Sequence, residues 1–266
     1  MTLDIVDAAR TMVRHYSSDD HVRNPNPALD PAAYDKLCQQ TPAAPDCALP
    51  LYWPAPPIRL SMRAGFHRFT WDLRFDPLGE DPDQGDEGAT GAVPHRTYEL
   101  PYSPWAPPGA YTVRLTVDGK RYEQPITLRL DPRVNTPAAA LTELNTLTRE
   151  LYDDAVLAHN AYAEARALVA RVADAAVKAK IEAIAPPESA TRRPRGFGGG
   201  GPGGAGSAAQ PTLASVSQGA MAAAMAMQGA DVAPTAGQVA AAAKARADVR
   251  TMIQQWAALK ASAGAR

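Results

Sequence analysis

The sequence predicts an α+β protein in which an all-β region is followed by an all-α region, because the composition changes along the chain. Residues 1–135 hold most of the aromatic residues and most of the prolines, whereas the rest is rich in alanine and leucine. A tract of glycine, proline, alanine and arginine interrupts the second region at residues 186–211. Such a tract has too few apolar groups to offset its backbone entropy. We therefore expect domains at residues 1–135 and 136–266, with a disordered linker inside the second.

Two β-hairpins are predicted in the first region. Apolar and acidic residues alternate over residues 3–8, and apolar residues resume over 12–16 after a short polar turn. The clearer hairpin covers residues 111–130, where Asp118-Gly119 is typical of a type I′ turn with positive φ at both positions. Pro125 has no N–H, so the second strand of this hairpin is expected at a sheet edge or a bulge.

A further strand is expected over residues 66–73, because every second residue there has a large or ring-bearing side chain: His67, Phe69, Trp71 and Leu73. These four side chains would face a core, and Trp71 is the largest of them. Residues 24–57 form a proline-rich insertion, since proline at this density prevents regular strand ladders. About seven short strands between turn signals predict an antiparallel β-sandwich of immunoglobulin or fibronectin type over residues 1–135.

The second region predicts long helices. Thr136-Pro137 provides a cap and a first helical residue, and a three-to-four spacing of apolar residues continues without a breaker to residue 184. Further helices are predicted over residues 213–228 and 235–263, the latter capped by Thr235. Because the apolar stripe of the first helix is made of small residues, partner helices must lie close to it. We expect a three-helix bundle or a hairpin packed on itself.

Charge and motif content exclude several functions. The chain has 27 Lys+Arg against 28 Asp+Glu, whereas nucleic-acid-binding domains are usually strongly basic. No apolar stretch is long enough for a transmembrane helix. The five histidines match no metal motif, and the acidic residues between 76 and 87 lack the order of a calcium loop. We expect no cofactor, no metal site and no catalytic residues.

The two cysteines, Cys38 and Cys47, lie in a proline-rich segment and leave two readings open. A disulfide between them would staple a loop and would require an oxidising compartment. Two reduced thiols would suit a cytoplasmic protein. Residues 1–16 carry charges where a secretory signal would be apolar. The expected location is therefore periplasmic or secreted if a signal lies upstream, and cytoplasmic otherwise.

Aromatic residues in the proline-rich segments are the candidate contact residues for a ligand. Aromatic rings can stack on sugar rings, or these side chains can instead cover the edge of the sandwich. The candidates for contact with a glycan or a protein partner are Tyr52, Trp53, Tyr102 and Trp105.

Several motifs resemble one protein family. They are the runs Gly65-Phe66-His67-Arg68-Phe69-Thr70-Trp71-Asp72-Leu73-Arg74 and Pro107 to Lys120, the segment Gln124 to Arg133, the opening Leu3 to Ala8, and the close Gln228 to Thr235. Together they are similar to the C-terminal region of large bacterial proteins described as BNR-repeat or sortilin (VPS10)-like glycosyl hydrolases. In that family an N-terminal β-propeller precedes this region.

The resemblance implies a function without implying an active site. The propeller, which would carry any hydrolase site, does not fall within these residues, so no catalytic residue is carried over. The resemblance implies a non-catalytic accessory module that supports or docks a β-propeller, or that associates with itself. The alternative is a fragment of a glycoside hydrolase whose aromatic residues contact glycan. Members of the family are usually exported, which would suit a Cys38–Cys47 bridge.

Overall fold

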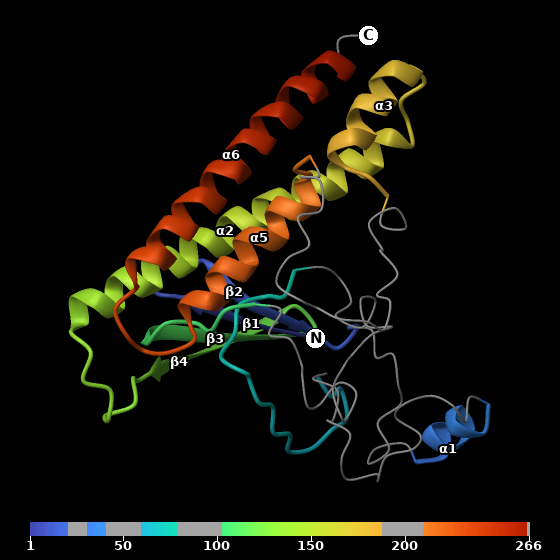
Figure 1. The fold of residues 1–266 in the computed structure, drawn as a ribbon. Helices are drawn as coiled ribbons and strands as arrows, with labels where there is room; N and C mark the ends of the chain where they lie inside the picture. Colours follow the sequence, from blue (N-terminus) through green and yellow to red (C-terminus); the bar gives the residue numbers. More distant parts are fainter. Residues whose placement is uncertain (21–30, 41–59, 79–102, 188–209, 265–266) are drawn as a thin grey trace. The chain divides into compact units, whose positions relative to one another are not determined.

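The computed structural model describes residues 1–20, 31–40, 60–78, 103–187 and 210–264. It divides into two compact units, Met1–Arg133 and Val134–Arg266. The first unit contains a four-stranded sheet and the second contains helices, which gives the α+β content that the sequence predicts (Figure 1). The predicted linker at 186–211 and most of the proline-rich insertion lie outside the described residues.

The sheet is built from two hairpins. Strands β1 (Thr2–Asp7) and β2 (Met12–Ser17) form one, and β3 (Gly109–Val117) and β4 (Lys120–Leu128) form the other. All neighbours are antiparallel and the strand order is β2-β1-β3-β4, because β1 also pairs with β3. Both predicted hairpins are therefore confirmed. The described part of the chain shows these four strands in place of the larger number that the sandwich prediction required.

The second hairpin has the predicted turn. Asp118 has φ 49° and Gly119 has φ 79°, so both turn residues have the positive φ that a type I′ turn needs. The turn pairs Val117 with Lys120 and places Pro125 opposite Thr112 on the edge strand β4. The edge position predicted for Pro125 is confirmed.

The strand predicted over residues 66–73 is wrong. This segment has irregular backbone, and its end makes only an isolated bridge between Arg74 and Trp105. Positive φ values at Gly65 (128°) and Leu73 (63°) interrupt extended backbone at the two ends of the segment, and residues 66–72 between them pair with no described strand. His67 and Leu73, predicted to face a core, are exposed.

The core of the first unit lies on the sheet and not along the 66–73 segment. Ile5, Tyr16 and Tyr111 are buried on one side of the sheet. Phe69 packs edge-on against Tyr16 with ring centroids 4.7 Å apart, and Trp71 packs edge-on against Tyr111 at 5.7 Å. Phe69 and Trp71 are half-buried, so they form the border of this core.

The second unit contains α2 (Ala138–Val169), α3 (Ala175–Ile184), α5 (Leu213–Met227) and α6 (Ala236–Gly264). The helices predicted over 213–228 and 235–263 are confirmed. The single helix predicted from 136 to 184 is wrong, because it breaks between α2 and α3. The carboxylate of Asp174 accepts hydrogen bonds from the N–H groups of Ala176 (2.9 Å) and Val177 (3.1 Å), so it caps a new helix there.

Local capping explains the other helix starts. At the start of α5, the Thr212 hydroxyl accepts from the Ser215 N–H, and the Ser215 hydroxyl accepts from the Thr212 N–H. Thr235 accepts from the Gln238 N–H at 3.2 Å, while the Gln238 side chain accepts from the Thr235 N–H at 2.9 Å, so the predicted Thr235 cap is confirmed. The predicted Thr136 cap and Pro137 start are wrong, because Pro137 is the N-cap of α2 with no side-chain cap, and the Thr136 hydroxyl donates to the carbonyl oxygen of Asp231.

Helices α2, α5 and α6 pack against one another around a shared apolar cluster: Leu144, Leu151, Ala224, Met227 and Ala242. The buried hydroxyl of Ser217 on α5 donates to the carbonyl of Ala155 on α2 at 2.8 Å. Arg246 on α6 pairs with Glu150 and Asp154 of α2. The small residues predicted to line α2, such as Ala155 and Ala158, are fully buried, which allows close helix contact. No described helix is both long enough and apolar enough to span a lipid bilayer.

Candidate functional site

Only part of the predicted contact set can be located. Tyr52, Trp53 and Tyr102 lie outside the described residues, as does Cys47. Cys38 lies on helix α1 (Pro31–Gln40), is half-buried and is disulfide-bonded. Its pairing with Cys47 stays a prediction.

Trp105 is the one predicted contact residue that the structure describes. Its side chain is 48% exposed. The guanidinium carbon of Arg74 lies 4.5 Å from the centroid of its ring, a cation–π contact, and the backbones of the two residues form an isolated bridge. The bridge and the cation therefore hold the ring in place while about half of its surface remains accessible.

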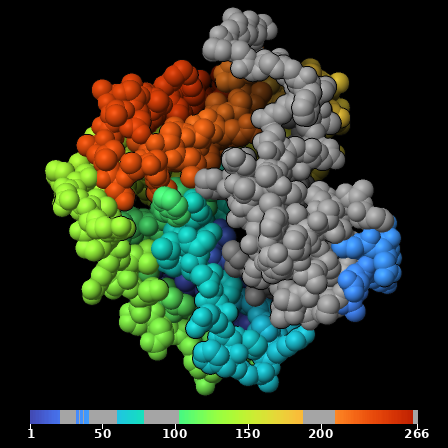
Figure 2. Space-filling model, turned by 60° about the horizontal axis from the view of Figure 1, so that its bottom comes forward, coloured from blue at the N-terminus to red at the C-terminus, as the bar shows by residue number. Residues whose placement is uncertain are grey.

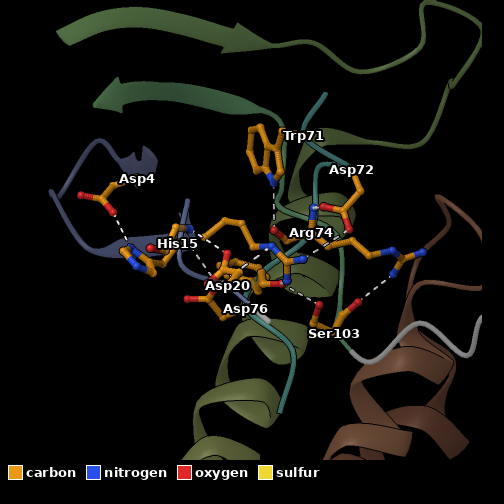
Figure 3. A network of polar contacts seen from close by, with 11 residues as sticks. Asp4, His15, Asp20, Trp71, Asp72, Arg74, Asp76 and Ser103 are labelled. Carbon is orange, nitrogen blue, oxygen red and sulfur yellow. Dashed lines mark hydrogen bonds and ion pairs between the residues drawn. The ribbon is translucent and has the colours of Figure 1, made fainter. Parts of the chain in front are cut away.

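Two segments meet at this bridge, residues 71–76 and 103–106, which we call the clasp (Figure 3). The N–H of Ala106 donates to the carbonyl of Leu73 at 2.7 Å, and the N–H of Phe75 donates to the carbonyl of Pro104 at 3.0 Å. These reciprocal backbone bonds join segments that lie about thirty residues apart in the sequence. The clasp thus closes a long excursion of the chain.

A tight local turn shapes the first segment of the clasp. The indole N–H of Trp71 donates to the carbonyl of Arg74 at 3.0 Å, and the carboxylate of Asp72 accepts from the Arg74 N–H at 3.1 Å. Leu73 between them takes a left-handed conformation, with φ 63°. A single turn is thus formed by four consecutive residues, Trp71, Asp72, Leu73 and Arg74. This is the same run on which the family resemblance partly rests.

The second segment is held by buried polar bonds. Arg74 donates from Nη1 to the carbonyl of Ser103 at 2.7 Å. Ser103 is 2% exposed, and its hydroxyl donates to the carbonyl of Phe75 at 2.6 Å. Because these groups are removed from water, losing one partner would leave the other unsatisfied.

The clasp is also bonded to the outer edge of β2. The N–H of Asp76 donates to the carbonyl of Val13 at 2.9 Å, and the carboxylate of Asp76 accepts from the His15 N–H at 2.9 Å. The Arg14 side chain donates to the carbonyl of Phe75 at 2.9 Å. The polar groups at one edge of the sheet are thereby covered, which protects that edge against pairing with another strand.

Charged groups gather around β2 and the clasp. The guanidinium of Arg14 lies 3.9 Å from Asp72 and 4.0 Å from Asp76. Burial raises the pKa of Asp76 above its ordinary value, opposed by the hydrogen bond from the His15 backbone and by Arg14. On the opposite side of the sheet from Arg14, the ring Nδ1 of His15 lies 2.7 Å from Asp4 (Figure 3). The sequence analysis missed this pair, although the hairpin register places Asp4 directly across from His15.

Tyr16 is the unusual member of this group. It is 3% exposed, and among the described residues its hydroxyl makes no hydrogen bond of good geometry. Burial raises the pKa of Tyr16 to about 12, although the nearby Arg14 guanidinium, 4.9 Å from its ring centroid, acts to lower this pKa. Its ring is therefore a core group, and its hydroxyl is held in the neutral form.

The chemistry of this region is mainly structural. The motif residues bind backbone groups and one another, and within the described ranges no three side chains of the metal-binding types gather. The ring of Trp105 is the accessible aromatic group of the clasp, where Asp72 and Leu73 are also exposed. No protein-family model, curated protein or solved structure matches the chain.

Proposed function

We propose that this chain is a non-catalytic interaction module that docks a β-propeller of the BNR-repeat or sortilin-like class. The clasp is the observation that supports the non-catalytic part of the proposal, and the propeller as partner rests on the resemblance of the sequence motifs. Polar residues of the Trp71–Arg74 run, which in an enzyme could face a substrate, hold two chain segments together. A module built in this way offers a rigid surface, with the polar residues of the clasp committed to holding the structure.

The proposal includes a finer architecture. In it, the four-stranded sheet belongs to an immunoglobulin- or fibronectin-like sandwich, whose inner face would be the side that carries Ile5, Tyr16 and Tyr111. The helices form a three-helix bundle, supported by the mutual contacts of α2, α5 and α6. Accessory modules of this kind act through surfaces rather than through a cleft.

Co-purification tests the proposal. The purified chain is mixed with β-propeller proteins of this class and separated by size-exclusion chromatography with light scattering. We expect a complex of defined stoichiometry with a propeller, or a defined oligomer of the chain itself. A partnerless monomer with every propeller would contradict the proposal.

A second function, glycan contact, is favoured by Trp105. Its half-exposed ring, fixed by Arg74, is suited to stack on a sugar ring. In this proposal the chain is a fragment of a glycoside hydrolase, and Tyr52, Trp53 and Tyr102 join Trp105 in the contact.

Two assays separate this function from the first. Calorimetric titration with a glycan panel should detect binding that Trp105→Ala removes and Trp105→Phe keeps in part. Hydrolysis of aryl glycosides by the purified chain would support the enzyme fragment. Absence of both binding and hydrolysis removes this alternative and leaves the docking proposal standing.

A further inference from the structure

A loop in the first unit presents apolar side chains directly to water. All residues from 61 to 68 are exposed. Phe66 is 95% exposed and Met62 is 70% exposed, the two most exposed of the large hydrophobic residues in the described ranges. The cyan atoms of residues 60–78 lie at the surface in Figure 2. We call residues 61–68 the Phe66 loop. Single exposed apolar residues are common, but a pair this exposed on one short loop suits a binding site better.

The loop has a defined shape. Gly65 has φ 128°, a conformation that other residues rarely adopt, and it turns the chain immediately before Phe66. The ring Nε2 of His67 lies 2.6 Å from the carbonyl oxygen of Arg63, and the Ser61 hydroxyl accepts from the Arg63 N–H at 3.3 Å. Phe66 is therefore held outward by bonds within the loop, without contact to a core.

The charge of the loop is one-sided. Arg63 and Arg68 flank Phe66 in the sequence, Met62 directly precedes Arg63, and no acidic residue occurs from residue 60 to residue 71. Two fixed cations beside exposed apolar groups favour an anionic surface into which apolar side chains can insert.

The small size of the loop decides between a protein partner and a lipid partner. A stable protein interface usually buries about 800 Å² on each side and needs roughly 20 to 30 residues. The Phe66 loop has far fewer residues, and a protein partner would also need a concave pocket that matches its tip. A membrane surface requires neither a minimum area nor a fixed shape, because lipids rearrange around an inserted side chain.

We propose that the Phe66 loop docks the protein on an anionic lipid membrane, with Phe66 and Met62 inserted at the headgroup level and Arg63 and Arg68 beside lipid phosphates. This site goes beyond the proposed docking of a propeller and does not depend on it. It also does not require a membrane-spanning segment. The expected binding is weak and reversible, because only two apolar side chains insert.

Vesicle co-sedimentation of the full chain tests this site. The probe is a sucrose-loaded vesicle of phosphatidylcholine with roughly 30% phosphatidylglycerol, at ~50 mM NaCl, where screening is weak. We expect the chain to bind these vesicles, to bind pure phosphatidylcholine vesicles far less, and to dissociate as the salt concentration rises. Failure to bind the anionic vesicles at low salt would overturn the proposal.

Matched variants locate the contact. Phe66→Ala should weaken binding about tenfold or more, whereas Phe66→Trp should keep it. Arg63→Gln with Arg68→Gln should weaken it roughly 30-fold at low salt. The controls remove an exposed leucine (Leu157→Ala) and two exposed lysines (Lys178→Gln with Lys180→Gln) from the helical unit and should bind as the wild type does.

Two outcomes of the variant series contradict the lipid assignment. Wild-type binding by Phe66→Ala and the double arginine variant would show that another surface binds the vesicles. Loss of propeller binding in Phe66→Ala, together with no binding of the wild type to vesicles, would assign the loop to an acidic protein partner. Since Phe66 is almost fully exposed, these variants should keep the wild-type melting temperature.

Discussion

At the scale of single residues, the first unit contains two local features that lower its stability. One is the buried hydroxyl of Tyr16, which makes no hydrogen bond of good geometry among the described residues. The other is the left-handed backbone of Leu73, whose side chain is 42% exposed. Each can be relieved by one substitution: Tyr16→Phe keeps the ring in the core, and Leu73→Gly removes a side chain that is only partly buried.

Tyr16→Phe should stabilise the protein. It removes an unsatisfied buried hydroxyl, whose desolvation costs roughly 1 kcal/mol or more, and keeps the ring against Phe69. Chemical denaturation at pH 7 should therefore show a free energy of unfolding about 1 kcal/mol higher than that of the wild type. A loss of that size instead would show that the hydroxyl is hydrogen-bonded.

The same variant has a predicted effect at alkaline pH. The pKa of Tyr16 is raised from 10.0 to about 12, so the folded state holds this proton more tightly than the unfolded state. The resulting stabilisation is complete below pH 10 and is lost as the pH rises toward 12, by about 2 to 3 kcal/mol. Tyr16→Phe should flatten this part of the stability curve, measured by denaturation at stepped pH. Curves that fall equally steeply for both proteins would contradict the raised pKa.

Leu73→Gly tests the strained turn of the clasp. A left-handed conformation costs a leucine about 1 kcal/mol, and glycine avoids this cost while losing some stability through its freer unfolded chain. We expect a melting temperature close to that of the wild type, because the relief of the backbone offsets the loss of the covered part of the leucine side chain. The β-branched control Leu73→Val should melt lower, because its side chain is more restricted in this conformation. The reverse order would contradict the left-handed backbone at Leu73.

At the scale of elements, most local signals in the sequence predicted the structure well, the Thr136 cap being an exception, and long-range ones did not. Asp118-Gly119 and Thr235 are turn and cap signals whose geometry is decided by neighbouring residues, and both were confirmed. The alternation around Trp71 failed because the chain turns at Leu73 and residues 73–75 bond to residues 103–106, which no periodicity reveals. The break before α3 had a local signal, the cap Asp174, which the apolar spacing concealed.

The candidate site was less predictable than the fold. Aromatic content pointed to Trp105 but not to its partner Arg74, because their contact depends on the bridge between the two clasp segments. Exposure also has no simple sequence signature. Phe66 and Phe69 are the same residue type three positions apart, yet Phe66 is almost fully exposed and Phe69 is half-buried against Tyr16.

The edge strand β4 leads to a further prediction. In a two-residue hairpin the pair Val117–Lys120 is hydrogen-bonded, and such pairs alternate along the ladder with pairs that are not. Pro125 and Thr112 form a pair that is not hydrogen-bonded, so the backbone nitrogen of residue 125 points away from β3. Pro125 therefore costs the ladder nothing and removes a donor that another strand could use. Pro125→Thr should increase self-association, measured by light scattering at high concentration.

A matched control accompanies the edge variant. Thr127 occupies the next outward-facing position, so Thr127→Pro adds a second blocked donor and should not increase association. Equal scattering by Pro125→Thr and the wild type would show that strand pairing at this edge is prevented by other means.

At the scale of the whole molecule, the protein has two compact units. One contains the sheet and the clasp, and the other contains helices with small residues at their contacts. In the first unit, polar side chains of the clasp maintain structure, while the ring of Trp105 and the Phe66 loop are among the exposed apolar groups. This division of roles is the physical basis for proposing a binding protein and not a catalyst.

Sedimentation velocity of the chain, alone and mixed with β-propeller proteins of the BNR-repeat or sortilin-like class, tests this central claim most directly. The account predicts a faster boundary whose position saturates at a fixed ratio of chain to propeller, or a defined oligomer of the chain alone. An unchanged monomer boundary for the chain at every concentration and with every propeller would contradict it.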